Sequence, residues 1–262
     1  MNKQKNNFFE KLYMILVYVF LYAPIVVLIV YSFNYSRIFG SWGGFSLRWY
    51  ERLFTHRQIL RSVRTTFIVA ISATFISTII GTLASVGIME YKKKTRRLLL
   101  SLNDLPVLNP DIVIAISLMV LFGILQIPKG YATLILSHIA FTIPYVILSV
   151  LPKLKMMDKN LIDAALDLGA TPLQAMRMVV IPEIKSGIFA GAMMAFTLSL
   201  DDFVISFFNV SPGINTISTT VYSMTKRGIE PTINALSAIM FTVVLILLIA
   251  ANINQFRTRK EK

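Results

Sequence analysis

The sequence contains no cysteine, which excludes disulfide bonds and thiolate metal sites. Its two histidines, His56 and His138, lie far apart in the chain and form no cluster with the spacing of metal ligands. We therefore expect no metal site.

Motifs of nucleotide hydrolysis and of common catalytic sites are also missing. The phosphate-binding pattern G-x-x-x-x-G-K-[ST] does not occur, and the stretch from Gly123 to Lys129 has the wrong spacing for it. No G-x-S-x-G, H-E-x-x-H or Ser-His-Asp pattern stands out. We expect no catalytic site, and no cofactor bound by this chain.

Apolar residues dominate instead. The chain has 262 residues, 55% of them hydrophobic, and a mean hydropathy of +0.67. A membrane-spanning helix needs about 20 mostly apolar residues, and the first such run is too long for a signal peptide. The sequence predicts an all-α polytopic membrane protein with a single domain over 1–262. Six spans are expected, at about 12–33, 65–89, 106–125, 130–151, 186–210 and 233–253.

The net charge of +13 would suggest nucleic acid as the partner of a soluble protein. Here we interpret it as a topology signal, because lysine and arginine gather in the loops on the cytoplasmic side of a membrane. Most basic residues lie on the inner side if both termini are cytoplasmic. The arginines of 37–61 run against this bias. We interpret that segment as a surface helix outside, with Trp42, Trp49 and Tyr50 at the membrane interface.

A polar segment over 158–187 interrupts the apolar runs and predicts two short helices joined by a sharp turn. Asp158 can cap the first helix, and Gly169 stands where a left-handed residue must end it. Thr171 can cap the second, with Pro172 at its first position and a T-x-x-Q capping box. Pro182 and Gly187 would mark its exit. An ordered loop between spans suggests that another protein docks there.

This segment resembles the cytoplasmic "EAA" loop of the permeases of ABC importers. The pattern E-A-A, three residues, G, nine residues, I-x-L-P is matched, within chemical class, by Asp163, Ala164, Ala165, Gly169, Val179, Ile181 and Pro182. The resemblance implies the type I importer fold. It also implies that the loop over 152–185 couples the permease to a separate ATPase subunit, which holds ATP and magnesium. An ordinary amphipathic loop on the membrane surface is the alternative.

Two adjacent carboxylates, Asp201 and Asp202, lie inside the predicted fifth span. A charge near the bilayer centre costs several kcal/mol, about 2.5–3.5 on insertion scales, so such residues normally face a protein interior or a water-filled path. Neighbouring positions on a helix point about 100 degrees apart. One acid can therefore line a path for cations while the other contacts a neighbouring helix. A purely structural role, such as capping a broken helix, is the alternative.

The string SLDDFVISFF at 199–208 resembles the permeases of spermidine/putrescine importers, specifically the second of their two permease subunits. The stretches 110–117, 137–146, 212–213, 222–224 and 233–237 fit the same subfamily. The resemblance implies a multi-pass permease of the cytoplasmic (inner) membrane that moves polyamines. Its implied partners are a second homologous permease forming a heterodimer, two ATPase subunits and an extracytoplasmic polyamine-binding protein.

Three further polar residues have open roles. Asp111 is a candidate for the substrate pathway or a helix cap, and Tyr222 is a candidate for the outer mouth or an interface anchor. His138 is expected to be buried, neutral and bonded to a neighbouring helix, with a role as a proton relay as the alternative. Two other functions remain open. One is a related permease for ferric iron or an aminophosphonate, and the other is an ion-coupled secondary transporter.

Overall fold

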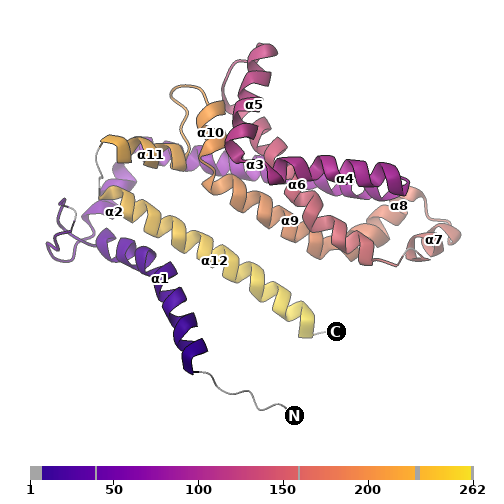
Figure 1. The fold of residues 1–262 in the computed structure, drawn as a ribbon, viewed down its shortest axis with the longest axis horizontal. Coiled ribbons are helices and arrows are strands. Elements are labelled where there is room, and N and C mark those ends of the chain that lie inside the picture. Colours follow the sequence, from indigo (N-terminus) through magenta and orange to yellow (C-terminus); the bar gives the residue numbers. More distant parts are fainter. Residues whose placement is uncertain (1–7, 39, 159, 228–230, 261–262) are drawn as a thin grey trace. The chain divides into compact units, whose positions relative to one another are not determined.

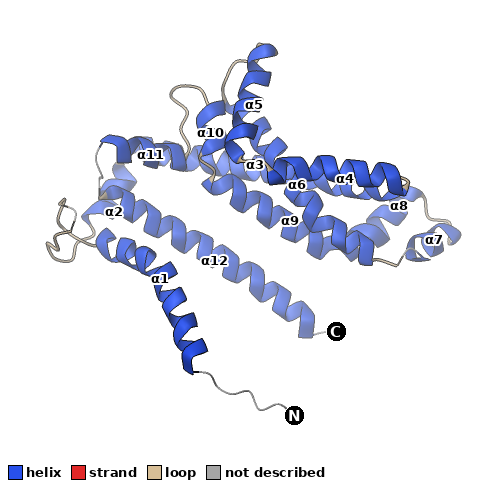
Figure 2. Ribbon diagram, in the orientation of Figure 1, coloured by secondary structure: helices blue, strands red, loops and turns tan. Residues whose placement is uncertain are grey.

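The protein is helical throughout the part that the structure describes. The structure, a computed structural model, describes residues 8–38, 40–158, 160–227 and 231–260. Within these ranges no strand is present, and the only β interaction is an isolated bridge between Asn34 and Phe45 (Figure 2). The all-α prediction is confirmed. Apolar segments in a bilayer form helices because a helix satisfies all its backbone polar groups internally.

Figure 1 shows how the helices follow one another along the chain. They are α1 (Phe8–Ser32), α2 (Arg48–Thr55), α3 (Arg57–Glu90), α4 (Lys93–Leu108), α5 (Asp111–Ile124), α6 (Tyr131–Met156), α7 (Asn160–Asp167), α8 (Pro172–Ala175), a π turn (Met176–Val180), α9 (Ile181–Asp201), α10 (Val204–Asn209), α11 (Ile217–Arg227) and α12 (Thr232–Lys260).

Within the described residues, four helical stretches are long and apolar enough to cross a membrane unaided: Glu10–Ser32, Arg57–Glu90, Tyr131–Met156 and Pro172–Asp201. A fifth span is available if α4 and α5, which meet at 104°, count as one, and a shorter apolar helix covers Thr232–Ile246. Each of the six predicted spans thus overlaps a helix or a broken helix. The single-domain arrangement over 1–262 stays a prediction.

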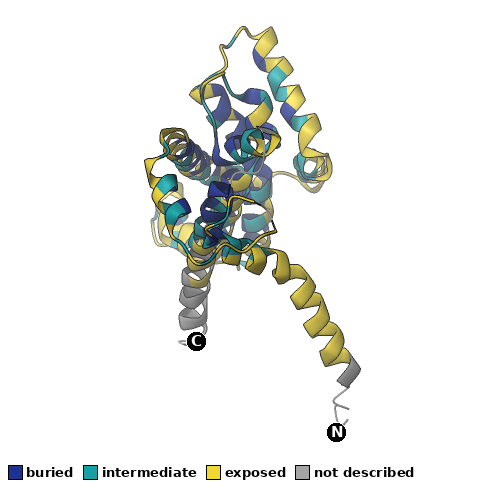
Figure 3. Cartoon of the chain, turned by 90° about the vertical axis from the view of Figure 1, so that its left-hand side faces the viewer, coloured by how far each residue is buried: buried dark blue, intermediate teal, exposed yellow. Residues whose placement is uncertain are grey.

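The chain forms two compact units, one of 1–60 with 221–262 and one of 61–220. In the first unit, α12 packs against α1 and α2. Figure 3 shows the described part of α1 with its side chains largely exposed, as expected of a helix that meets lipid.

The loop between α1 and α2 corrects one sequence-based expectation. Trp49 was expected at the membrane interface, but its side chain is fully buried and its indole N–H donates to the carbonyl of Asn34 at 2.6 Å. The Tyr50 hydroxyl lies 2.7 Å from the Ser32 hydroxyl. Only Trp42 is exposed, at 55%. Tryptophan and tyrosine are common at the membrane interface, but a buried indole N–H needs a hydrogen-bond acceptor, and the Asn34 carbonyl supplies one for Trp49.

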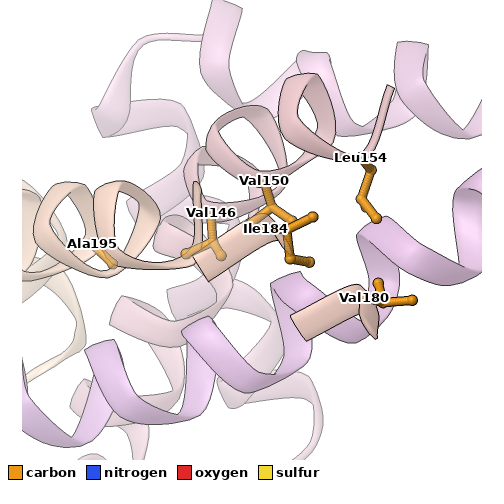
Figure 4. Close-up of a cluster of buried hydrophobic side chains, with 6 residues drawn as sticks. All are labelled: Val146, Val150, Leu154, Val180, Ile184 and Ala195. Carbon is orange, nitrogen blue, oxygen red and sulfur yellow. The ribbon is translucent and has the colours of Figure 1, made fainter. Parts of the chain in front are cut away.

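The second unit is built on the packing of α6 against α9. Figure 4 shows its core of buried aliphatic side chains from both helices and the π turn, namely Val146, Val150, Leu154, Val180, Ile184 and Ala195. A Cβ atom at Gly187 would lie 3.0 Å from the Ser149 carbonyl and 2.8 Å from Lys153 Cγ. Gly187 therefore permits close packing of the two helices. The expectation that it ends the polar segment was wrong, because it lies inside α9.

Two predicted spans are broken in the structure. The predicted span 106–125 begins inside α4, and the chain bends sharply before α5, at Pro110. Proline lacks a backbone N–H and disfavours helical geometry in the residue before it, here Asn109. The predicted span 186–210 is interrupted after Asp201, where α9 ends and the short α10 follows.

Candidate functional site

The turn after α7 forms as the sequence predicts. Gly169 has a φ of +85°, in the left-handed region that glycine adopts without strain. The Gly169 N–H donates to the Leu166 carbonyl at 2.9 Å, and the Ala170 N–H donates to the Ala165 carbonyl at 3.0 Å. These bonds use carbonyls that the end of a helix would otherwise leave unpaired.

The capping box after the turn is complete. The Thr171 N–H donates to Gln174 Oε1 at 2.7 Å, and the Gln174 N–H donates to Thr171 Oγ1 at 3.3 Å. Pro172 follows at the first helical position. At the other end of the segment, Asp158 Oδ1 accepts from the Asn160 N–H at 3.0 Å, at the start of α7.

The helix that starts at Pro172 continues far beyond its predicted end. It passes through the π turn and merges with α9, giving a continuous helical stretch over Pro172–Asp201. Pro182 lies at the start of α9 and does not end the helix. Proline normally interrupts an α-helix, because it lacks an N–H and crowds the carbonyl four residues earlier. In a π turn, each backbone N–H bonds instead to the carbonyl five residues earlier. The Ile181 N–H indeed donates to the Met176 carbonyl, so we attribute the continuation to the π turn.

This helical stretch, α7 and the turn between them carry exposed apolar side chains, which we call the coupling surface after the role proposed for it below. Its large side chains are exposed although they are apolar: Leu161 at 44%, Leu168 at 89%, Leu173 at 61% and Met178 at 74%. Asp163 and Ala164 are also exposed, whereas Ala165 is half-buried. Ile162 and Met176 pack against the core of the second unit. Some side chains of the segment are thus packed against the core, and others are exposed.

The two acids of the predicted fifth span take different positions. Asp202 is a helix cap: its Oδ1 accepts from the Ile205 N–H at 3.1 Å, and its Oδ2 accepts from the Ser206 N–H at 2.8 Å. Its side chain is 5% exposed. Asp201 is exposed, and its backbone carbonyl accepts from the Ser218 hydroxyl at 3.1 Å. Only Asp201 therefore presents its carboxylate to the surroundings.

A buried polar network surrounds the break between α9 and α10. His138 of α6 is fully buried; its Nδ1 lies 2.7 Å from Ser199 Oγ, and its Nε2 lies 3.1 Å from Ser206 Oγ. The same Nε2 lies 3.6 Å from Asp202 Oδ2. The expected bond from a buried His138 to a neighbouring helix is present. The roles of Ser199 and Ser206 were missed, although their spacing from Asp202, three residues before and four after, was a helical-face signal.

The far end of α10 is also fixed. Lys129 Nζ donates to the Phe208 carbonyl at 3.0 Å, and the Thr133 hydroxyl donates to the Asn209 carbonyl at 3.0 Å. The Asn209 side-chain amide donates to the Ala115 carbonyl of α5 at 3.1 Å. A cation and side-chain donors stabilise a helix C-terminus, because the last carbonyls have no partner within the helix and carry a partial negative charge.

The other two candidate pathway residues lie on α5 and α11. Asp111 is the exposed first residue of α5, next to the bend at Pro110. Tyr222 lies on the α11 segment of the first unit, and the Lys226 ammonium lies over its ring, 4.9 Å from the centroid. Among the described residues, no three His, Cys, Asp or Glu side chains gather as metal ligands would.

Comparison with known proteins identifies the family. Residues 77–260 match the family model described as "Binding-protein-dependent transport system inner membrane component". The spermidine/putrescine transport system permease protein PotC of Escherichia coli (strain K12) is 36% identical over 241 residues, 92% of this chain and 91% of that protein. PotC of Haemophilus influenzae is 33% identical, covering 97% of both chains. The putrescine transport system permease protein PotI of Escherichia coli is 34% identical, covering 88% of this chain and 85% of that protein.

A solved structure shares the fold. A bacterial ABC transporter involved in the import of the acidic polysaccharide alginate contains a chain with a TM-score of 0.73 and 18% identity, covering 95% of this chain and 94% of that one. The resemblance to importer permeases, drawn from the EAA-like segment, is thereby confirmed. The chain belongs to the family of inner-membrane components of binding-protein-dependent transport systems, whose members are transport subunits of ABC importers and not enzymes.

Proposed function

We propose that this protein is a permease subunit of an ATP-driven importer that moves polyamines, spermidine or putrescine, across the cytoplasmic membrane. The observation that carries the proposal is the 36% identity over 92% of the chain with a spermidine/putrescine permease. The exposed carboxylate of Asp201 agrees with a cationic substrate, because an acid along a path attracts cations.

The coupling surface is the proposed contact with an ATPase subunit. Exposed apolar side chains rimmed by polar residues mark protein-binding sites, and Leu168 and Met178 are among the most exposed apolar residues of the chain. ATP and magnesium would be held by that partner, and two ATPase subunits would serve two permeases. The second permease would be a homologous chain, and an extracytoplasmic binding protein would deliver polyamine.

The proposed mechanism is alternating access. Closure of the ATPase subunits on ATP would move the coupling surface, and the continuous helical stretch Pro172–Asp201 would carry the motion to the acid pair. The stretch is helical without interruption from Pro172 to Asp201, which supports coupling between its two ends. With both termini cytoplasmic, the coupling surface lies on the side where ATP is available.

Substrate contact is assigned first to Asp201. Asp202 uses its carboxylate oxygens to cap α10 and is nearly buried, so it would act on a cation through its charge at longer range. Asp111 and Tyr222 remain proposed pathway residues, because an exposed carboxylate and an aromatic face each attract an alkylammonium group.

The test is uptake of labelled spermidine and putrescine by the complex reconstituted in vesicles, with and without this subunit. We expect uptake that requires ATP, the binding protein and this chain. Uptake of ferric iron or an aminophosphonate in place of polyamine would overturn the substrate. Uptake driven by an ion gradient without the ATPase would overturn the coupling to ATP.

A further inference from the structure

One imidazole spans the break that interrupts the fifth span. His138 contacts Ser199 in the last turns of α9 through one ring nitrogen and Ser206 in α10 through the other. A neutral imidazole has one N–H donor and one acceptor nitrogen. One of the two bonds is therefore donated by the ring and the other by a serine hydroxyl. Both polar atoms of the ring are used, on opposite sides of the break.

The site is buried, so these bonds have no substitute. His138, Ser199 and Ser206 are 0%, 3% and 0% exposed. A buried polar group that loses its partner costs about 1–3 kcal/mol, because water cannot replace the bond. Separation of α10 from α9 would break at least one of these contacts. The network thus favours a single geometry at the break.

Helix α6 contacts α10 at both of its ends. His138 binds the first turn of α10 through Ser206, and Thr133 of α6 donates to the Asn209 carbonyl at its last residue. Asp202 caps the start of α10 and lies 3.6 Å from the imidazole. Asp201, one residue earlier, is outside this network and exposed. The exposed acid is the last residue of α9 and directly precedes the break that α6 contacts on both sides.

We propose that His138 is a positioning residue: it clamps the α9–α10 break to α6 and thereby fixes where Asp201 presents its carboxylate. Ser199 and Ser206 are the atoms through which it acts. The consequence for transport rests on the proposed function, whereas the clamp itself is a property of the fold that can be measured without substrate.

Because the sequence contains no cysteine, a single introduced thiol can report on the position of α10 without reaction at other sites of this chain. Ala115 of α5 is fully buried and packs against Ile205 of α10, so an Ala115→Cys thiol is shielded while α10 is held. The reaction rate of this thiol with a small methanethiosulfonate reagent would be measured in the assembled complex. We expect His138→Ala to raise that rate about tenfold, which corresponds to the loss of about 1.4 kcal/mol of buried bonding.

A conservative variant and a matched control keep the test specific. His138→Gln retains one donor and one acceptor with the reach to contact Ser206, so it should restore both thiol protection and most of the uptake lost in His138→Ala. Thr142 lies one turn further along α6 and is buried, and its hydroxyl donates within its own helix, to the His138 and Ile139 carbonyls. Thr142→Val should leave both readings near those of the parent.

The two readouts separate the clamp from the transport function. If the parent complex takes up no polyamine but His138→Ala still exposes the thiol, the proposed function fails and the clamp stands. If His138→Ala leaves thiol protection and uptake per assembled complex unchanged, the clamp is overturned. Equal losses in His138→Gln and His138→Ala would also overturn it, because the site would then need the imidazole itself and not a bridge.

Discussion

Two of the places in the second unit where a helix stops and a capped helix restarts are built differently. At the coupling surface, the turn at Gly169 and the capping box of Thr171 use partners within a few residues, and the side chains are exposed. At the α9–α10 break, the Asp202 cap is nearly buried, and it sits in a network that reaches His138 on another helix.

The difference matches the two tasks that we propose. A segment that must fit a separate subunit needs a shape that persists when it is exposed, and local caps supply this without tertiary support. A break inside a membrane span cannot leave backbone groups unpaired in lipid, so it needs buried hydrogen-bond acceptors and partners from neighbouring helices. Substitutions in either the exposed turn or the buried break test this difference, and they are ordered from the largest expected effect to the smallest.

Gly169→Pro should abolish coupling. Proline cannot reach a φ of +85° and removes the N–H that donates to Leu166. We expect stimulation of ATP hydrolysis by the loaded binding protein to fall at least about tenfold, in line with a penalty of a few kcal/mol. Gly169→Asn is the control, because asparagine tolerates the left-handed region. Normal stimulation in the proline variant would remove the coupling role of this turn.

Asp202→Ala should destabilise the permease and lower the yield of assembled complex. The change removes a buried cap from two backbone N–H groups, at a cost of about 1–3 kcal/mol. Asp202→Asn keeps one acceptor and should lose less. Thermal unfolding of the purified complex measures the effect. An unchanged midpoint in the alanine variant would mean that the cap is dispensable.

Asp201→Asn should do the reverse: stability should stay the same while polyamine uptake weakens. The Asp201 residue is exposed, whereas the carboxylate that caps α10 is that of Asp202. Losing one charge contact near the substrate should raise the KM for uptake about fivefold, which corresponds to about 1 kcal/mol. Asp201→Glu is the matched control. If neither Asp201→Asn nor Asp202→Asn alters transport, the cation-site hypothesis is wrong.

Thr171→Ala should give the smallest effect. It removes the side-chain acceptor of the Gln174 N–H at an exposed helix start, worth about 1 kcal/mol. We expect a decrease of about twofold in stimulated ATP hydrolysis, since the turn at Gly169 remains. Thr171→Ser keeps the acceptor and should behave as the parent. A loss as large as that of Gly169→Pro would show that the two caps act as one unit.

The features that sequence reasoning located are those that depend on near neighbours. The left-handed Gly169 and the Thr171–Gln174 box follow from residue types within three positions of each other. The π turn was not predicted, and without it Pro182 seemed to end the helix. The burial of Trp49 was missed as well, because its partner, the Asn34 carbonyl, lies across a loop 15 residues away.

The sequence by itself determined the membrane class, the approximate spans, the importer family and the capped turn of the coupling surface. Apolar runs, charge bias and helix caps depend on residues that are close together in the chain. Only the tertiary structure decided which acid is buried and which is exposed, and which side chains close the α9–α10 break. His138 meets its two serines across 61 and 68 positions. Contacts at that separation depend on how α6 packs against α9, and no local pattern encodes that packing.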